Sequence, residues 1–433
     1  MPTPSLRTVL LAVVPLIVSM GILVLGNTLF GTLVSLRLDL DGVSIDHIGL
    51  IMALYSVGFV AGTLLCPRVV GAVGHIRAFA AFAAIVSAAS LAHALWVDEF
   101  LWGALRMLAG FCVAFLFTIV ESWLNAKAPN EVRGQVMSAY MVVYYLASGS
   151  SQSFLSFVDP AGFQLFAVIA MVISLSLVPL TLARVDTPPQ IQTDRLSLRA
   201  LMRISPLGVA GCFGAGLIVG SFYAMAPVYA RGVDASPDWV ARFMMVAILA
   251  GFALQFPVGR LSDRFDRRSV ILGLTVATSA TGLAIAVFGG LSVWALLILV
   301  ALYSGLSLTL YPISLSHAND YLTPSQLVPA SAGLLLCYGV GAIIGPIAAS
   351  WAMGRSGTDG LFYYIAFVSA LLALFTLWRM TRRQSLPNDE QGAFVAVPQT
   401  TYVVAELDPR YEPDNDDQLS FDFEAGDEVK ETA

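Results

Sequence analysis

Charged residues are scarce in this chain of 433 residues. Asp, Glu, Lys and Arg together make up 12% of it, whereas hydrophobic residues make up 57%. A soluble globular domain uses about twice that share of charged residues, mostly to cover its surface. The composition therefore excludes an ordinary soluble protein.

Lysine and cysteine are also scarce. The two lysines, Lys127 and Lys430, do not follow a GxxxxG stretch, so the chain has no phosphate-binding loop and cannot drive transport with ATP by itself. The sequence contains no CxxC or HExxH motif, and its four cysteines are widely spaced within or beside apolar stretches: Cys66, Cys112, Cys212 and Cys337. We therefore expect no disulfide framework, no metal site and no cofactor.

Long apolar stretches occupy most of the chain instead. Thr8–Leu36, for example, has no charged residue before Arg37. About 20 such residues cross the roughly 30 Å hydrocarbon core as a helix, which pairs its own backbone amides within the segment. The sequence predicts an all-α membrane protein with twelve spans, over residues 8–36, 46–70, 75–97, 100–125, 134–157, 162–184, 206–230, 237–260, 269–290, 292–319, 325–353 and 358–381.

A polar segment with the pair Pro188-Pro189 separates the first six predicted spans from the last six. The chain after Arg383 differs again, because it holds 13 acidic residues and only two basic ones, and such a segment buries too little apolar surface to become ordered. We therefore expect four parts: an N-terminal six-helix bundle (1–184), a cytoplasmic linker (185–205), a C-terminal six-helix bundle (206–383) and an acidic, disordered cytoplasmic tail (384–433).

Basic residues predict the orientation. With both termini in the cytoplasm, the cytoplasmic side carries 16 Lys and Arg residues and the outer loops carry four, namely Arg37, Arg231, Arg242 and Arg355. Positively charged loops resist translocation, so this split predicts a multi-pass protein of the plasma membrane, most simply a bacterial inner membrane, with both termini inside.

One motif stands out between the eighth and ninth predicted spans. It reads Gly259-Arg-Leu-Ser-Asp-Arg-Phe-Asp-Arg-Arg268, with Asp263 at the membrane edge, where an arginine or a helix N-terminus can meet its charge. Residues 67–77 hold a decayed copy between the second and third spans, with Gly71 where the aspartate would fall. Two short polar stretches, at 121–129 and 316–324, each end in proline and form a further weak repeat between the halves.

These features resemble the major facilitator superfamily, whose signature is G-x-L-x-D-R-x-G-R-R/K. Arg106-x-x-x-Gly110 is similar to another element of that family, and GHIRAFA (74–80) with ESWLNAKAPNEVRGQ (121–135) is similar to its poorly characterised YcaD-like branch. The resemblance covers residues 8–383. It implies two six-helix bundles related by a pseudo-two-fold axis about a central cavity, but no particular substrate.

Arg106 is the one charge deep inside a predicted span. Its insertion into hydrocarbon costs about 2.5–3.5 kcal/mol, so its side chain should face protein or a wet cavity. On the functional interpretation, Arg106 contacts an anionic or polar substrate group or takes part in coupling, with Asn27 at similar depth on the first span. On the alternative, it extends outward to Glu99, two turns away on the same helix. We favour the functional interpretation.

Other polar residues within the spans are further candidates. Glu121 either takes up a proton when it is sealed from water or pairs permanently with Arg68, Arg77 or Arg133 at an inner gate, and we favour the gate. The gate candidates from the signature loop are Gly259, Asp263, Arg264 and Arg268. With Asn27 and Arg106, the candidates that line the cavity are Tyr144, Gln152, Tyr223, Gln255, Tyr303, Ser307 and Tyr311, each of which could instead make an interhelical hydrogen bond.

The sequence therefore predicts a secondary transporter, not an enzyme, that moves a small solute by alternating access. The solute is expected to be anionic or polar, and proton coupling is left open. The partners are the solute and the lipid bilayer, with protons as an optional co-substrate, no nucleic acid and a monomeric chain. A channel or uncoupled facilitator is the alternative, although no filter loop or ring of charges is present. A weaker alternative is an intramembrane enzyme that uses Gly149-Ser-Ser151 and His317.

Overall fold

The computed structural model of the chain describes residues 6–128, 132–182, 196–382, 384, 386–387 and 390–408. Within these ranges the secondary structure is helical, with no β-strand. The predicted linker at 185–205 and the predicted tail at 384–433 therefore lie partly outside the described residues.

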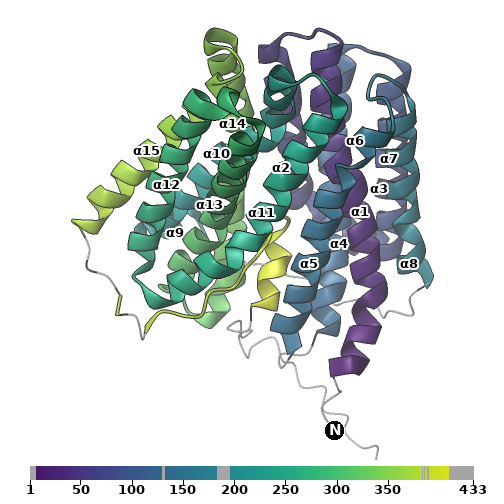
Figure 1. Ribbon diagram of the computed structural model, residues 1–433. Coiled ribbons are helices and arrows are strands. Elements are labelled where there is room, and N and C mark those ends of the chain that lie inside the picture. Colours follow the sequence, from purple (N-terminus) through teal and green to yellow (C-terminus); the bar gives the residue numbers. More distant parts are fainter. Residues whose placement is uncertain are drawn as a thin grey trace, which may run out of the picture.

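The helices fall into two sets along the chain (Figure 1). The N-terminal half contains α1 (Leu6–Leu40), α2 (Ile45–Val73), α3 (His75–Leu95), α4 (Glu99–Lys127), α5 (Arg133–Ser151), α6 (Phe154–Phe157), α7 (Gln164–Leu175) and α8 (Leu177–Leu182). The C-terminal half contains α9 (Leu198–Ile204), α10 (Pro206–Val233), α11 (Pro237–Arg264), α12 (Arg267–Phe288), α13 (Val293–Asn319), α14 (Leu327–Ser356) and α15 (Gly360–Met380). Short 3₁₀ turns cover Gly289–Leu291, Pro324–Gln326 and Tyr402–Leu407.

Polar side chains fix where several of the helices begin. Ser44 precedes α2 and its hydroxyl accepts from the backbone N–H of His47, while Asp98 precedes α4 and accepts from Leu101 N at 2.8 Å. Such caps satisfy N–H groups that have no partner within the helix. The short loops between spans therefore lie at defined positions on the two ends of the bundle.

Within the described ranges, eleven helices are long and apolar enough to cross a membrane. The predicted span at 134–157 is not among them. It corresponds to α5 and the short α6, and α5 contains polar and aromatic residues because it packs against α1 and across to α11 of the other half.

The two ends of the bundle differ in charge. We call the end that carries the loops α2–α3, α4–α5 and α11–α12 the basic end, and the end that carries Asp39, Asp98 and Asp234 the acidic end. The start of α1 and the end of α15 both lie at the basic end (Figure 1). This is the grouping of loops that the 16-to-4 split assumes.

The two halves are joined directly at the acidic end. Arg231 Nη1 of α10 lies 2.6 Å from Asp39 Oδ2 of α1, and the hydroxyl of Ser35 donates to the carbonyl of Ala224 at 2.6 Å. Nearby, Gly49 of α2 packs so tightly on α14 that an added Cβ would collide with the side chain of Ser350. These contacts hold the two halves together at the acidic end.

Glycines bring α2 and α4 together inside the N-terminal half. A Cβ added at Gly110 of α4 would collide with the carbonyl oxygen of Tyr55, and one added at Gly58 of α2 would collide with that of Met107. Small residues permit such close backbone approach between membrane helices. The position of Tyr55 relative to Arg106 depends on this contact.

The structure differs from the expectation of a tail disordered from residue 384 onward. Residues 390–408 lie between the two halves at the basic end, where Figure 1 shows them as a yellow segment beneath α11. Val397, Thr400, Tyr402 and Val403 of this segment are buried. The sequence shows that Phe394–Ala405 is more apolar than the rest of the tail, but the acidic residues, most of which lie after residue 408, favoured disorder for the whole segment. Residues 409–433 lie outside the described residues.

We expect Gly110→Ala to destabilise the protein, because the new methyl group must displace the α2 backbone. Overpacking of this kind costs about 1–3 kcal/mol. The apparent Tm in detergent should fall by several degrees. Gly273→Ala on α12 is the matched control, since nothing lies within 4 Å of its added Cβ and alanine suits a helix better than glycine. An equal Tm for Gly110→Ala and Gly273→Ala would contradict the close contact.

Candidate functional site

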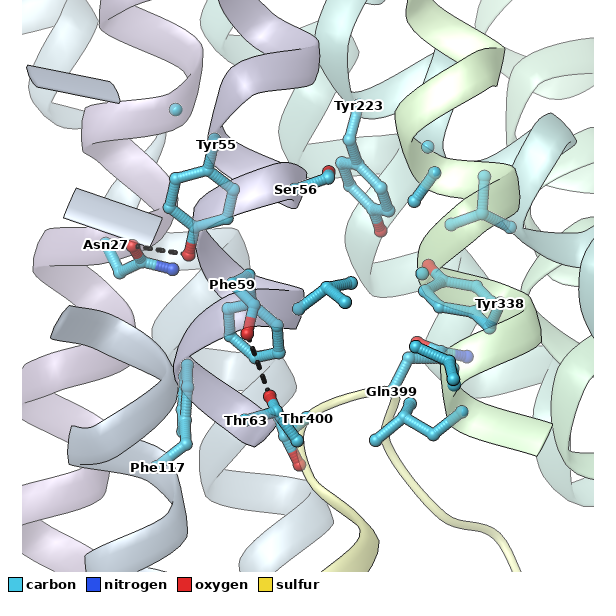
Figure 2. Close-up of a pocket in the computed structure, with 18 of the residues that line it drawn as sticks. Asn27, Tyr55, Ser56, Phe59, Thr63, Phe117, Tyr223, Tyr338, Gln399 and Thr400 are labelled. Carbon is cyan, nitrogen blue, oxygen red and sulfur yellow. Dashed lines mark hydrogen bonds between the residues drawn. The ribbon is translucent and has the colours of Figure 1, made fainter. Parts of the chain in front are cut away.

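A cavity lies between the two halves of the bundle, roughly at the middle of its length. Its volume is about 340 Å³, which is within the range of small-molecule sites. Helices α1, α2, α4 and α5 form one wall, while α10, α11, α13 and α14 form the other. Figure 2 shows Asn27, Tyr55 and Phe59 on the first wall facing Tyr223 and Tyr338 on the second.

Arg106 is the cavity's one lining residue with a permanent charge among the described residues. Its side chain is only 3% exposed, and its Nε and one Nη nitrogen have no hydrogen-bond partner in the part of the chain that the structure describes. The guanidinium carbon instead lies 4.4 Å from the centre of the Tyr55 ring and 5.4 Å from that of Phe30. Cation–π contacts of this kind offset part of the cost of burying the charge.

The neighbours of Arg106 hold its aromatic partner in place. Tyr55 donates a hydrogen bond from its hydroxyl to Asn27 Oδ1 at 3.1 Å, a contact visible in Figure 2. Glu99, the alternative partner considered for Arg106, lies 2.6 Å from Nδ1 of His47 instead. Arg106 therefore does not extend outward to Glu99, and its side chain remains part of the cavity lining.

Four of the nine residues expected to line the cavity do so: Asn27, Arg106, Tyr144 and Tyr223. The other five are absent from its lining. Gln255 Nε2 donates to the hydroxyl of Tyr145 at 3.1 Å, which joins α11 to α5, and Gln152 Nε2 donates to Ser151 Oγ at 3.0 Å. The remaining three, all on α13, are buried against other residues: Tyr303, Ser307 and Tyr311.

The C-terminal segment contributes to the floor of the cavity. Gln399, Thr400 and Tyr402 belong to its lining, and Figure 2 shows Gln399 and Thr400 on an irregular stretch of chain between the halves. The hydroxyls of Thr400 and Thr401 both donate to the carboxylate of Glu121 on α4, which also accepts from the hydroxyl of Tyr140 at 2.5 Å. Glu121 is fully buried.

The partners of Glu121 differ from the predicted ones. In the part of the chain that the structure describes, the Glu121 carboxylate forms no ion pair with Arg68, Arg77 or Arg133. Arg68 and Arg77 are exposed. Arg133 donates to the carbonyl of Ala128 at 3.3 Å. Hydroxyl groups take the place of the predicted arginines because the C-terminal segment covers this face of α4 with Thr400 and Thr401. The position of this segment could not be predicted from the sequence.

A second polar cluster lies at the start of α12. Arg267 is 1% exposed, pairs with the buried carboxylate of Asp320, and donates to the carbonyls of Ser316 (3.1 Å) and Gly392. Gly392 N donates in turn to Asp320 Oδ1 at 3.1 Å. The polar stretch at 316–324 thus contacts the signature loop through Arg267, which was not among the gate candidates.

The predicted gate residues of the signature loop lie around this cluster. Asp263 accepts a hydrogen bond from Phe394 N at 2.7 Å and lies 3.8 Å from Arg267. Gly259 allows the Phe394 ring to pack on α11, because an added Cβ would collide with that ring. Arg268 pairs with Asp266 at 3.0 Å, and Arg264 is exposed. The loop therefore binds the C-terminal segment.

Glu406, which belongs to the C-terminal segment and lies outside the spans, has a carboxyl group with a shifted pKa. Burial raises the pKa of its carboxyl to about 7, while the nearby Arg133 charge and a hydrogen bond from Asn125 act in the opposite direction. Asn125 Nδ2 lies 3.2 Å from Glu406 Oε2 and also donates to the carbonyl of Val403 at 2.6 Å. The docked segment therefore favours the protonated form of Glu406.

Among the described residues, no cluster of three or more His, Cys, Asp and Glu side chains could hold a metal ion. The residues that sequence reasoning missed are Tyr55, Tyr338, Thr400 and Arg267. Tyr55 carried a weak signal, since it lies one turn before Gly58 on an otherwise apolar span. Arg267 lies within the signature motif, but its partner Asp320 is distant in the sequence, and Thr400 carried no signal.

The family comparison matches nearly the whole helical part of the chain. A model of the Major Facilitator Superfamily matches residues 16–254 and 235–409. A curated relative from Shigella flexneri serotype 5b (strain 8401), described as an uncharacterized MFS-type transporter YcaD, is 30% identical over 369 residues, covering 82% of this chain and 92% of the relative. The YcaD protein of Escherichia coli O139:H28 (strain E24377A / ETEC) matches with the same identity and coverage.

Solved transporter structures share the fold. The nucleoside transporter NupG is 14% identical with a TM-score of 0.67, and covers 86% of this chain and 98% of that one. A bacterial homolog of the human lysosomal transporter Spinster, inward-facing and occupied, is 13% identical with a TM-score of 0.67, covering 90% and 99%. The D-xylose-proton symporter is 17% identical with a TM-score of 0.64, covering 88% and 99%. At these identities the likeness concerns the fold alone.

Arg106 and Arg267, both buried, should respond differently to replacement by methionine. Arg106→Met removes an ion without an acidic partner, so we expect the apparent Tm in detergent to stay level or rise. Arg267→Met leaves Asp320 buried without its ion-pair partner, which costs about 3–5 kcal/mol, so the Tm should fall clearly. A loss of Tm in Arg106→Met as large as that in Arg267→Met would show that Arg106 has a structural role.

Proposed function

The chain belongs to the major facilitator superfamily, and from that premise we propose that it carries a small solute with an anionic or strongly polar group by alternating access, without ATP. The observation that carries this proposal is the unpartnered guanidinium of Arg106 at the central cavity. A buried charge of this kind is seldom kept for packing alone.

The guanidinium supports an anionic solute on electrostatic grounds. Tyr55 and Phe30 offer it only ring faces, and Asn27 Oδ1 already accepts from Tyr55. A carboxylate or phosphate that entered the cavity would supply the missing acceptors, and the low-dielectric walls would strengthen the contact. Arginine suits this role because its planar fork binds two oxygens at once.

The opposite wall supports a solute that also has an apolar or ring-shaped part. Tyr223 and Tyr338 face the cavity from α10 and α14, and Phe59 and Phe117 face it from the N-terminal half (Figure 2). Aromatic rings bury apolar surface while their hydroxyls remain available to polar groups. We therefore favour small organic anions over inorganic ones.

The contacts at the acidic end support alternating access over an open channel. The Arg231–Asp39 ion pair and the Gly49 contact with α14 join the halves on that side, so solute reaches the cavity from the basic end. We place the basic end in the cytoplasm, because basic loops resist translocation. A C-terminal reporter that works only outside the cytoplasm would contradict this orientation.

Proton coupling, if present, would act through Glu121. It is a fully buried carboxylate that accepts hydrogen bonds from the hydroxyls of Tyr140 and of Thr400, and Thr400 belongs to the cavity lining. Uptake measured with and without a pH gradient, in the original chain and in Glu121→Gln, tests this point. A pH-gradient effect that persists in Glu121→Gln would exclude this residue.

We expect Arg106→Lys and Arg106→Ala to reduce solute counterflow in proteoliposomes roughly tenfold or more, since a hydrogen-bonded charge contributes about 1.5–3 kcal/mol. Lysine should fail because a point ammonium does not reproduce the bidentate fork. A screen of small organic anions supplies the solute.

Glu99→Gln is the control for these variants, because Glu99 is exposed and contacts His47 rather than Arg106. It should retain counterflow. Normal counterflow in both Arg106 variants would remove the anionic-substrate proposal, and the absence of counterflow for every solute would favour a channel.

A further inference from the structure

We propose that residues 390–408, which we call the C-terminal strap, form a releasable plug that docks at the basic end of the cavity and must leave it before solute can pass. This inference rests on the proposed transport function. It assigns Glu121 and Asn125 of α4 and the α11–α12 turn as the docking site.

The strap is attached to the N-terminal half through α4. Glu121 accepts hydrogen bonds from the hydroxyls of both Thr400 and Thr401, and Asn125 donates to the carbonyl of Val403 at 2.6 Å. Hydrogen bonds to a charged group are about twice as strong as those between neutral groups. The Val403 and Tyr402 side chains are buried beside these contacts.

The strap is attached to the C-terminal half as well. Phe394 N donates to Asp263 at 2.7 Å, and the carbonyl of Gly392 accepts from Arg267. The 3₁₀ turn at Tyr402–Leu407 packs against α14 in addition to α4 and α5. One short segment therefore binds both halves at the end where they must separate and rejoin.

This bridging has a mechanical consequence. In alternating access the two halves rock against each other about the central site. A segment bound to Glu121 on one half and to Asp263 on the other resists that movement. It also places Gln399 and Thr400 in the cavity lining on the path to the basic end (Figure 2).

The contacts also explain how the strap could be released without unfolding the bundle. Its hydrogen bonds to Glu121, Asn125 and Asp263 involve side chains that water could satisfy after undocking. The strap begins ten residues after α15 ends at Met380. A short tether gives a high effective concentration, so the strap redocks readily after each release.

The test is the accessibility of the cavity to a charged thiol reagent in inside-out vesicles. Ser56→Cys places a reporter on the cavity wall, and the four native cysteines are all buried, so labelling of the chain without the reporter gives the background. The reagent is a cationic methanethiosulfonate. We expect slow labelling in the original chain and labelling roughly tenfold faster or more in Thr400→Val with Thr401→Val, because two hydrogen bonds to a carboxylate are lost.

Thr381→Val is the matched control, since among the described residues its hydroxyl donates to the carbonyl of Trp378 in its own helix. It should leave the labelling rate unchanged. Hydrogen exchange checks the variants: amide exchange in 390–408 should speed up while exchange in α4 and α11 stays slow, which excludes general unfolding. Equal labelling rates in all three chains would overturn the plug. Neither readout requires transport, so the strap is testable even if the Arg106 variants carry solute normally.

Strap docking should weaken as pH rises. The pKa of Glu406 is about 7 in the docked state against an ordinary 4.5, so the docked state holds an extra proton between these values and loses that advantage as pH rises through about 7. We expect faster reporter labelling at pH 8 than at pH 5, after normalisation to an exposed cysteine.

The groups that face Glu406 are Asn125 and Arg133 of the N-terminal half. Glu406→Gln keeps the hydrogen bond with Asn125 and removes the titration, so it should flatten the pH dependence while Glu121 remains intact. A pH dependence of equal size in Glu406→Gln would assign the effect to another group, such as Glu121, and would contradict the role of Glu406.

Discussion

The close contact between the backbones of α2 and α4 determines where the cavity's charge lies. Gly58 and Gly110 let the two helices touch, and this contact places the Tyr55 ring over the guanidinium of Arg106. The spacing Arg106-x-x-x-Gly110 therefore has a physical meaning: the glycine sets the helix separation and the arginine, one turn away, uses it. A charge buried against ring faces without an acidic partner is costly, and the anionic solute that we propose would relieve that cost.

The two halves are held together by different means at the two ends of the bundle. Helix side chains and glycine contacts join the halves at the acidic end, whereas a segment from beyond the last helix joins them at the basic end. Contacts between packed helices of the two halves separate only when the halves move as rigid bodies. On our proposal the tethered segment can also leave by itself, which would make access from the basic end sensitive to pH through Glu406.

The sequence predicted the fold well because long apolar stretches leave few alternatives to a helical bundle. It also predicted Arg106 and Asn27 at the cavity, since a deep charge in a span needs a polar neighbour. It failed at Tyr303 and Gln255, because hydropathy does not reveal which face of a buried helix meets the cavity. Thr400 and its bond to Glu121 could not be predicted, because the contact joins residues 279 positions apart and the surrounding acidic composition indicated disorder.

The central claim is that the Arg106 guanidinium binds the anionic group of the solute. The most direct measurement is thermal stabilisation of the purified chain by a panel of small organic anions and their neutral isosteres, since a ligand that binds only the folded state raises its stability. The account predicts that some anions raise the apparent Tm, that their neutral isosteres do not, and that the shift disappears in Arg106→Met. Stabilisation by neutral solutes that is equally large in Arg106→Met would contradict it.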